Sequence, residues 1–175
     1  MEVIKLPFSV LFTLLFPKRA ASLEENPTDA YSQSVKGFGY QWFEPKDIDK
    51  ACMWHEMAAN QGEPDSQNEL GVIYSEGPEE KRDLSRAAFW TRKGAESNHP
   101  AAQVRLAKMY ASGTGLEESH SMAYRWAMIC SEMWDWTQDG SREARRLVPL
   151  YRSKLDKQTV YDIDREVRLW IALHP

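Results

Sequence analysis

The chain has little of several features that would assign it to a familiar functional class. It contains only two cysteines in 175 residues, has no run of lysine or arginine, and carries a net charge of −4. A nucleic-acid-binding domain usually shows a basic face, so nucleic acid is excluded as the expected partner. Hydrophobic residues make up 42% and charged residues 27%. This balance indicates a folded domain and not a disordered tail.

Motifs for catalysis and metal binding are absent or incomplete. No Ser-x-x-Lys and no Gly-x-Ser-x-Gly sequence occurs, so an activated serine is not indicated. His55 and Glu56 open the zinc-protease motif, but Ala59 stands where the second histidine belongs. We interpret His55 and Glu56 as a solvated pair. The four histidines fall in different predicted elements: His55, His99, His120 and His174. The sequence therefore predicts no catalytic residue, no cofactor and no metal site.

The N-terminus differs from the rest of the chain. Residues 6–16 form an uncharged run of eleven residues, too short for a membrane-spanning helix of about 20 residues. The run fits the hydrophobic part of a secretory signal peptide, with small residues for cleavage after Ser22. Lys18 and Arg19 follow it, and a packed N-terminal helix or an interfacial anchor is the alternative. We expect residues 1–22 to be a signal peptide. If this segment is cleaved, the mature chain is expected to be periplasmic or secreted, without a stable membrane span. If it is not cleaved, the chain is expected to be cytoplasmic.

A period of thirty-six residues runs through the chain. Trp54, Trp90 and Trp126 are each thirty-six residues apart. Small, apolar and aromatic residues keep the same interval and are predicted packing positions: Ala51, Ala87 and Ala123; Ala59 and Ala95; Leu70 and Leu106; Tyr74 and Tyr110; Gly77 and Gly113. A period of this length is typical of repeat architectures, in which neighbouring units share a core.

Each repeat is predicted to be a pair of helices. Ala87, Trp90 and Ala95 follow the i, i+3, i+8 spacing of one helical face. Asp83 lies thirty-six residues after Asp47, and both precede a helical stretch as N-caps. Because one unit alone cannot bury both of its faces, the pairs must stack. We therefore predict an all-α fold, an α-solenoid of about eight helices in four antiparallel pairs.

The register also sets the limits of the array. We expect a leading degenerate half-repeat over residues 23–47 and regular repeats over residues 48–136. Residues 137–175 are predicted to hold a degenerate last repeat and a C-terminal capping helix. In this last helix apolar residues share one face and charged residues lie between them. The segment Met133–Thr137 replaces the short turn of the earlier units.

The most regular unit, from Ala51 to Gly77, reads Ala-x-x-Trp-x-x-x-Ala-Ala-x-x-Gly-x-x-Asp-x-Gln-x-x-Leu-Gly-x-x-Tyr-x-x-Gly. This motif closely resembles the Sel-one-like repeat, a relative of the tetratricopeptide repeat. The resemblance is tight over residues 51–126 and looser from about 28 to 173, and Glu79 and Gly94 depart from the usual residues. It implies a right-handed superhelix and an adaptor or partner-recruiting role, often in exported bacterial proteins. It brings no shared catalytic residues.

The two cysteines are expected to remain unpaired. Cys52 and Cys130 lie in the first helices of the first and third repeats. Helices pack about 8–10 Å apart, which separates these sites by roughly 20 Å. A disulfide needs Cα atoms within about 7 Å. The chain thus departs from the cysteine-rich exported relatives, in which bridges staple each repeat, and free thiols suit either compartment.

Two surfaces are candidates for partner binding. Trp134 and Trp136 lie in the irregular connector, and tryptophan is enriched at binding hot spots. The alternative is that both fill a gap before the C-terminal helices. The second candidate is the outer side of one first helix, where Phe89 is the apolar residue among charges that include Arg86 and Lys93. A solvated face is the alternative there.

Two functions of different class follow. The first is a non-catalytic adaptor that binds a protein or peptide of unknown identity on the solenoid surface. The alternative is a β-lactam-binding or β-lactam-hydrolysing enzyme like the cysteine-rich exported relatives. The sequence favours the adaptor, because it shows no nucleophile with an adjacent base.

Overall fold

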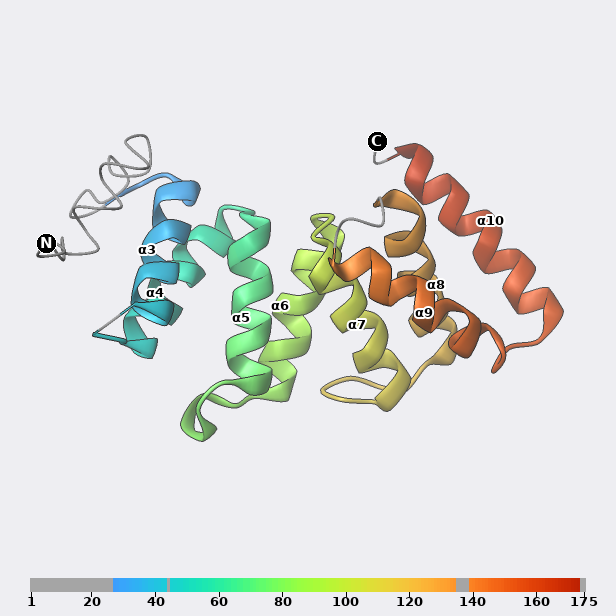
Figure 1. The fold of residues 1–175 in the computed structure, drawn as a ribbon, viewed down its shortest axis with the longest axis horizontal. Coiled ribbons are helices and arrows are strands. Elements are labelled where there is room, and N and C mark those ends of the chain that lie inside the picture. The colour runs from blue at the N-terminus through green and yellow to red at the C-terminus, as the bar shows by residue number, and fades with distance from the viewer. Residues whose placement is uncertain (1–26, 44, 135–138, 174–175) are drawn as a thin grey trace, which may run out of the picture. The chain divides into compact units, whose positions relative to one another are not determined.

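The computed structural model describes residues 27–43, 45–134 and 139–173. Within these ranges the chain forms eight α-helices and one short 3-10 helix, with no β-strand (Figure 1). The helices are α3 (Ala30–Trp42), α4 (Ile48–Asn60), α5 (Pro64–Glu76), α6 (Leu84–Glu96), α7 (Pro100–Ser112), α8 (His120–Met133), α9 (Asp139–Arg152) and α10 (Lys157–Leu173), and the 3-10 helix is η2 (Glu79–Lys81). The prediction of an all-α fold is confirmed.

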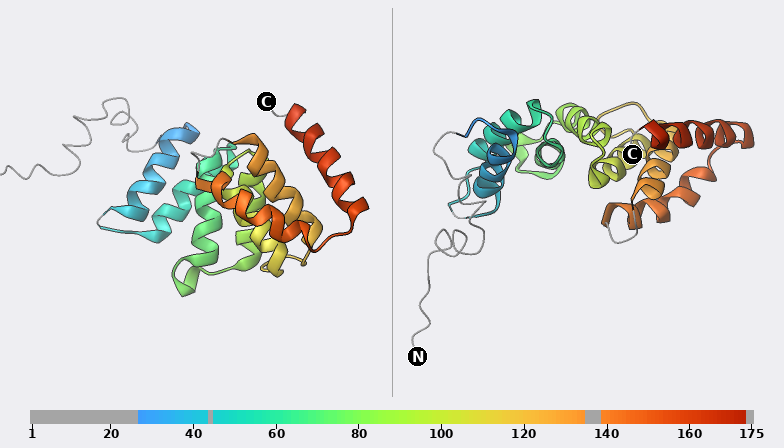
Figure 2. Two further views of the ribbon diagram at one scale, coloured as in Figure 1. Left: turned by 45° about the vertical axis from the view of Figure 1, so that its right-hand side comes forward. Right: turned by 90° about the horizontal axis from the view of Figure 1, so that it is seen from above.

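The chain divides into two compact units, residues 1–66 and 67–175. In the first unit α3 packs on α4. In the second unit α6 packs on α7, α7 on α8 and α9, and α8 on both α9 and α10. Figure 2 shows α10 lying beside α8. These helices therefore pack on helices that are next, or next but one, in the sequence, as expected of a repeat array.

The first helices keep the predicted period. α4, α6 and α8 begin at Ile48, Leu84 and His120, each thirty-six residues after the one before. The same interval separates their N-cap residues, Asp47, Asp83 and Ser119, whose side chains each accept a backbone N–H group of the first turn. These bonds satisfy donors that have no partner inside the helix. The predicted N-caps at Asp47 and Asp83 are confirmed.

The second helices of the first two repeats keep the same period. α5 begins at Pro64 and α7 at Pro100, and proline suits a first helical turn. In the third repeat the first helix, α8, ends at Met133, one residue later than the period places it, and Trp134 is its C-cap. Residues 135–138, where the period places the start of the next helix, lie outside the described residues, and the described part of α9 runs from Asp139.

The predicted packing positions lie mostly in the interior. Eleven of the fourteen are buried, and Gly77, Tyr110 and Gly113 are half-buried. Gly77 is packed against the last turn of α5, where an added Cβ would lie 2.4 Å from the Ile73 carbonyl oxygen. Gly113 ends α7 in the left-handed conformation, with φ of 69°. A glycine at these two positions is required by a close approach and by the backbone angle.

The C-terminal helix packs one face on the core of the second unit. Val160, Ile163 and Val167 are buried, and the Trp126 and Trp170 rings meet edge to face with centroids 5.8 Å apart. The opposite face of α10 is in solvent but is not wholly polar, because Tyr161, Leu169 and Leu173 are exposed there.

Candidate functional site

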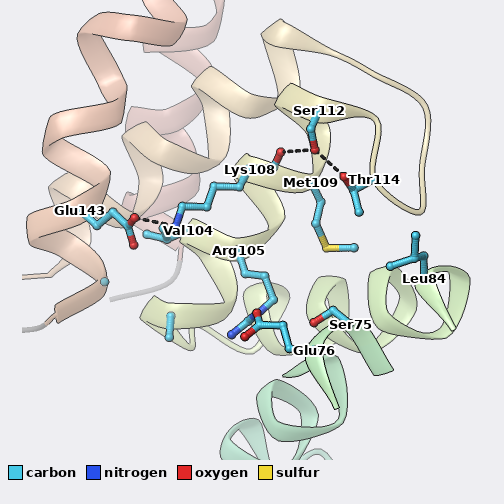
Figure 3. A pocket seen from close by; sticks show the side chains of 12 residues that line it. Ser75, Glu76, Leu84, Val104, Arg105, Lys108, Met109, Ser112, Thr114 and Glu143 are labelled. Carbon is cyan, nitrogen blue, oxygen red and sulfur yellow. Dashed lines mark hydrogen bonds and ion pairs between the residues drawn. The ribbon is translucent and has the colours of Figure 1, made fainter. Parts of the chain in front are cut away.

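A pocket of about 500 Å³ opens in the second unit (Figure 3). It lies between the end of α5, the start of α6, the length of α7 and the start of α9. Charged, hydroxyl and apolar residues line it together: Ser75, Glu76, Leu84, Ala101, Val104, Arg105, Lys108, Met109, Ser112, Thr114, Gly140 and Glu143. The volume falls within the range of about 300–1,000 Å³ typical of ligand sites.

Two cations of α7 and two carboxylates from other helices carry the charge of the pocket. Arg105 forms an ion pair with Glu76, the last residue of α5. Lys108 lies one turn further along α7, and its Nζ is 2.6 Å from Oε1 of Glu143 in α9. Figure 3 shows the two carboxylates on either side of the two cations. The lining is electrically balanced, and α7 bears all of its positive charge.

Hydroxyl groups line the pocket beside the charges. Ser75 Oγ donates to the Gly71 carbonyl oxygen at 2.7 Å. Ser112 Oγ donates to the Lys108 carbonyl oxygen at 3.0 Å and lies 2.6 Å from Thr114 Oγ1. Because the Ser75 hydroxyl proton is engaged by the backbone, its oxygen is left to accept hydrogen bonds from a ligand.

The apolar part of the pocket is tied to the core. Val104 and Met109 are buried, while Leu84 is exposed at its rim. α9 reaches α7 closely because Gly140 has no Cβ, which would lie 2.7 Å from the Pro100 carbonyl. An apolar side chain of a ligand would therefore contact a closely packed apolar surface, the apolar wall of the pocket.

The structure places Trp134 in the packing behind this wall. Its Nε1 donates to Gln103 Oε1 at 3.2 Å, and its carbonyl accepts from Arg145 Nη2 at 3.0 Å. Its half-buried side chain packs against the cluster of Val104, Cys130 and Ala144. Trp136, the other predicted contact of this connector, lies outside the described residues. Of these described contacts of Trp134, Val104 is the residue that also lines the pocket.

The other predicted contacts lie on the exposed side of α6 and not in the pocket. Phe89 is 53% exposed and meets the Trp90 ring edge to face. The Arg86 guanidinium lies 4.1 Å from the centre of the Tyr74 ring. Lys93 is exposed. These three residues form a separate cationic and aromatic surface, hereafter the α6 face.

The interpretation of His55 as a solvated residue is wrong. His55 is fully buried in α4, with Nδ1 3.0 Å from Ser66 Oγ and Nε2 3.0 Å from Gln41 Oε1. The Phe38 ring meets it edge to face at 5.0 Å. Burial lowers the pKa of His55 to about 4, so the neutral ring is stable inside the unit. An amide oxygen can only accept, so Nε2 donates to Gln41 and Nδ1 accepts from Ser66.

In the part of the chain that the structure describes, we find no cluster of metal ligands and no exposed thiol. No three histidine, cysteine, aspartate or glutamate side chains gather there as metal ligands would. Cys52 and Cys130 are buried and form no disulfide among the described residues, and burial raises the pKa of Cys130 to about 12. Among the described helices, none combines the length and apolar character needed to cross a membrane.

Sequence reasoning missed the pocket because its charged residues do not repeat. One period before Arg105 stands Glu69, and one period before Lys108 stands Val72. Residues that recur with the period are those that pack the scaffold. The available signal for a site was the pair of positive charges on α7 that do not recur.

Comparison with known proteins identifies the architecture. A family model described as Sel1 repeat matches residues 37–63, 64–99 and 100–127. Among solved structures, this chain is similar to a Sel1 repeat protein from Oxalobacter formigenes, with a TM-score of 0.66 and 22% sequence identity. The similarity covers 82% of this chain and 58% of that one. At this identity the likeness concerns the fold, and it confirms the predicted α-solenoid of helix pairs.

Proposed function

Because this chain belongs to the Sel1 repeat family, we propose that it is a non-catalytic scaffold or adaptor that binds a protein or peptide partner. The pocket between α5, α7 and α9 is the proposed site of that contact. The observation that carries the proposal is the mixed lining of this pocket, in which ion pairs, hydroxyls and an apolar wall lie side by side. Peptides present these same three kinds of group.

The α6 face is proposed as a second contact with the same kind of partner. Arg86, Phe89 and Lys93 present an aromatic ring between two cations, and tryptophan, tyrosine and arginine are the residues that most often dominate interfaces. Trp134 and Trp136 stay predicted contact residues. In the described structure Trp134 supports the pocket through Val104, so its loss is expected to act on the pocket wall.

A pocket-filling variant tests the main proposal. Ser112→Trp places a bulky ring at the exposed end of α7, inside the pocket lining. Ser153→Trp is the matched control, since Ser153 is exposed directly after the end of α9 and, like Ser112, donates its hydroxyl to a carbonyl oxygen of the preceding turn. Quantitative affinity purification should recover partners with the wild type and Ser153→Trp but not with Ser112→Trp. Equal recovery by both variants, with both folded, would remove the pocket as the site.

The non-catalytic part of the proposal has its own test. Turnover of nitrocefin by the purified chain should not exceed the background rate. Hydrolysis that saturates with substrate and is abolished by Ser112→Trp would contradict this part of the proposal.

We also propose that the chain is exported after cleavage behind Ser22. The support is the uncharged run of residues 6–16 followed by small residues, all of which lie outside the described residues. Mass spectrometry of the protein isolated from its own cells is the direct measurement. A mature N-terminus at Leu23 is the expected result, and an intact Met1 would contradict it.

A further inference from the structure

The two cations of the pocket are better placed for a ligand than the two carboxylates are. Arg105 and Lys108 lie three residues apart on one helix, so a single anionic group can approach both. Glu76 and Glu143 come from α5 and α9 and lie on opposite sides of that pair (Figure 3). A single cationic group cannot reach both carboxylates in the same way. The geometry therefore favours an anion over α7.

Arg105 has unused capacity to donate hydrogen bonds. Its guanidinium carries five N–H donors, and the Nε group is buried without a hydrogen-bond partner. Its ion pair with Glu76 engages Nη1. A buried donor without a partner is unfavourable, and a carboxylate can accept two parallel bonds from a guanidinium. A ligand carboxylate that takes the place of Glu76, with the guanidinium turned so that it also donates from Nε, would satisfy this donor.

Glu76 is a replaceable partner for Arg105. The Glu76 side chain is 64% exposed, whereas that of Arg105 is 23% exposed. An ion pair with so exposed a carboxylate contributes little to stability, because water and salt screen it. Glu76 can therefore turn into solvent when another carboxylate takes its place.

The surroundings of the cations suit a peptide better than a free anion. The Ser75 oxygen is available to accept a backbone N–H group, since its proton is donated to Gly71. Leu84 and Met109 offer apolar contact within the same pocket. A side-chain carboxylate over α7 and a neighbouring apolar side chain on this wall fit these features together.

We infer that the pocket binds an extended peptide segment in which an aspartate or glutamate stands next to an apolar residue. The acidic side chain takes the place of Glu76 on Arg105 and lies within reach of Lys108. This inference rests on the proposed function, because it names the class of partner that the same pocket accepts.

Selection from a library tests the inference without a known partner. Phage-displayed random heptapeptides are selected on the immobilised full chain, and bound phage are competed with an excess of soluble wild type. The selected peptides should share an acidic residue beside an apolar one. A fluorescein-labelled selected peptide and its analogue with Asp→Asn or Glu→Gln are then compared by fluorescence anisotropy. The analogue should bind about tenfold or more weakly, as expected for loss of a charge-assisted bond.

Variants of opposite expected sign make the test specific. Arg105→Gln should weaken binding of the acidic peptide by about tenfold or more. Glu76→Gln should strengthen it by about threefold, because the internal competitor is removed. Arg165→Gln, at an exposed arginine of α10 outside the pocket, should leave it unchanged. Since Glu76 is exposed, its variant is expected to fold even if Arg105→Gln is not stable.

The outcomes separate this inference from the proposed function. Peptides that bind the wild type and are lost in Ser112→Trp, yet lack acidic residues or ignore Arg105→Gln, would overturn the inference and leave the pocket as the site. A Glu76→Gln variant that binds the acidic peptide more weakly would also overturn the inference. If no selected peptide responds to Ser112→Trp, both the inference and the proposed site fail.

Discussion

The same position of two repeats holds His55 in α4 and Thr91 in α6, and the two repeats treat their polar side chains differently. Both residues are fully buried, and each faces a glycine of the preceding helix. A Cβ on Gly37 would lie 2.6 Å from the His55 ring, and a Cβ on Gly71 would lie 2.5 Å from Thr91 Oγ1. His55 has two hydrogen-bond partners, whereas the Thr91 hydroxyl has none among the described residues.

The repeat determines that this position is buried, whereas each helix determines whether the polar side chain there has hydrogen-bond partners. Ala127 occupies the same position in α8 and is also fully buried, so the repeat fixes burial and not chemistry. Polar atoms at such a position stabilise the fold only when local residues satisfy them. Ser66 and Gln41 do this for His55. Removing the hydrogen bonds of His55 should therefore destabilise the fold, whereas removing only the hydroxyl of Thr91 should stabilise it.

Replacing His55 is expected to have the largest effect. His55→Ala leaves a cavity and removes the partner of both Ser66 and Gln41, which should lower the free energy of unfolding by roughly 3–4 kcal/mol. Thr91→Ala removes less volume and no hydrogen bond, so its cost should be about 1–2 kcal/mol. Urea denaturation followed by circular dichroism measures both. Equal losses in the two variants would show that the hydrogen bonds of His55 contribute nothing.

Acid should destabilise the fold through the same histidine. The unfolded chain binds a proton at His55 with a pKa near 6.5, and the folded chain binds it only near 4. Between these values the unfolded state holds more protons, so stability falls as the pH drops from 6.5 to 4 and this contribution is constant below 4. The loss is on the order of 3 kcal/mol for a shift of this size.

A non-titrating variant isolates the contribution of His55 to acid sensitivity. Unfolding free energies of the wild type and His55→Gln are measured from pH 7.5 to 4, and the difference between them is followed. It should change by the stated amount in favour of the variant as the pH falls. If the difference in unfolding free energy stays constant across this window, His55 has the same pKa in the folded and the unfolded chain.

The glycine opposite the ring gives a smaller effect with a matched control in the same helix. Gly37→Ala forces a methyl group into the His55 ring and should cost about 1–3 kcal/mol. Gly39→Ala meets nothing within 4 Å and should stabilise α3 by up to about 1 kcal/mol through helix propensity. Both are read from urea midpoints. A Gly37→Ala variant as stable as Gly39→Ala would mean that the ring moves aside without penalty.

The thirty-six-residue period was enough to predict the helix pairs and two N-caps, because packing positions and caps recur where the backbone recurs. The burial of His55 was also within reach. It lies four residues after Ala51 and four before Ala59, which places it on the packing face. The prediction of a solvated pair followed from the incomplete zinc motif and did not use that spacing.

The pocket was not predictable from the period. Arg105 and Lys108 meet carboxylates of other helices, Glu76 and Glu143, and neither carboxylate stands a whole period from its partner, so no repeat register aligns these residues. Only the packed arrangement of α5, α7 and α9 brings them together. A period describes how neighbouring units stack, whereas a site depends on the residues in which the units differ.

The smallest expected effect is that of Thr91→Val. The sign of its change in unfolding free energy tells whether the Thr91 hydroxyl lacks a hydrogen-bond partner. Thr91→Val keeps the shape of the side chain and removes a buried hydroxyl without a partner, so it should raise the free energy of unfolding by about 0.5–1 kcal/mol. The matched substitution of a satisfied buried hydroxyl is Ser66→Ala, which should lower it by about 1–2 kcal/mol because His55 loses a donor. Both changes are resolved by urea denaturation in triplicate. If Thr91→Val is destabilising by as much as Ser66→Ala, the Thr91 hydroxyl is satisfied in solution and the two repeats do not differ in the way described.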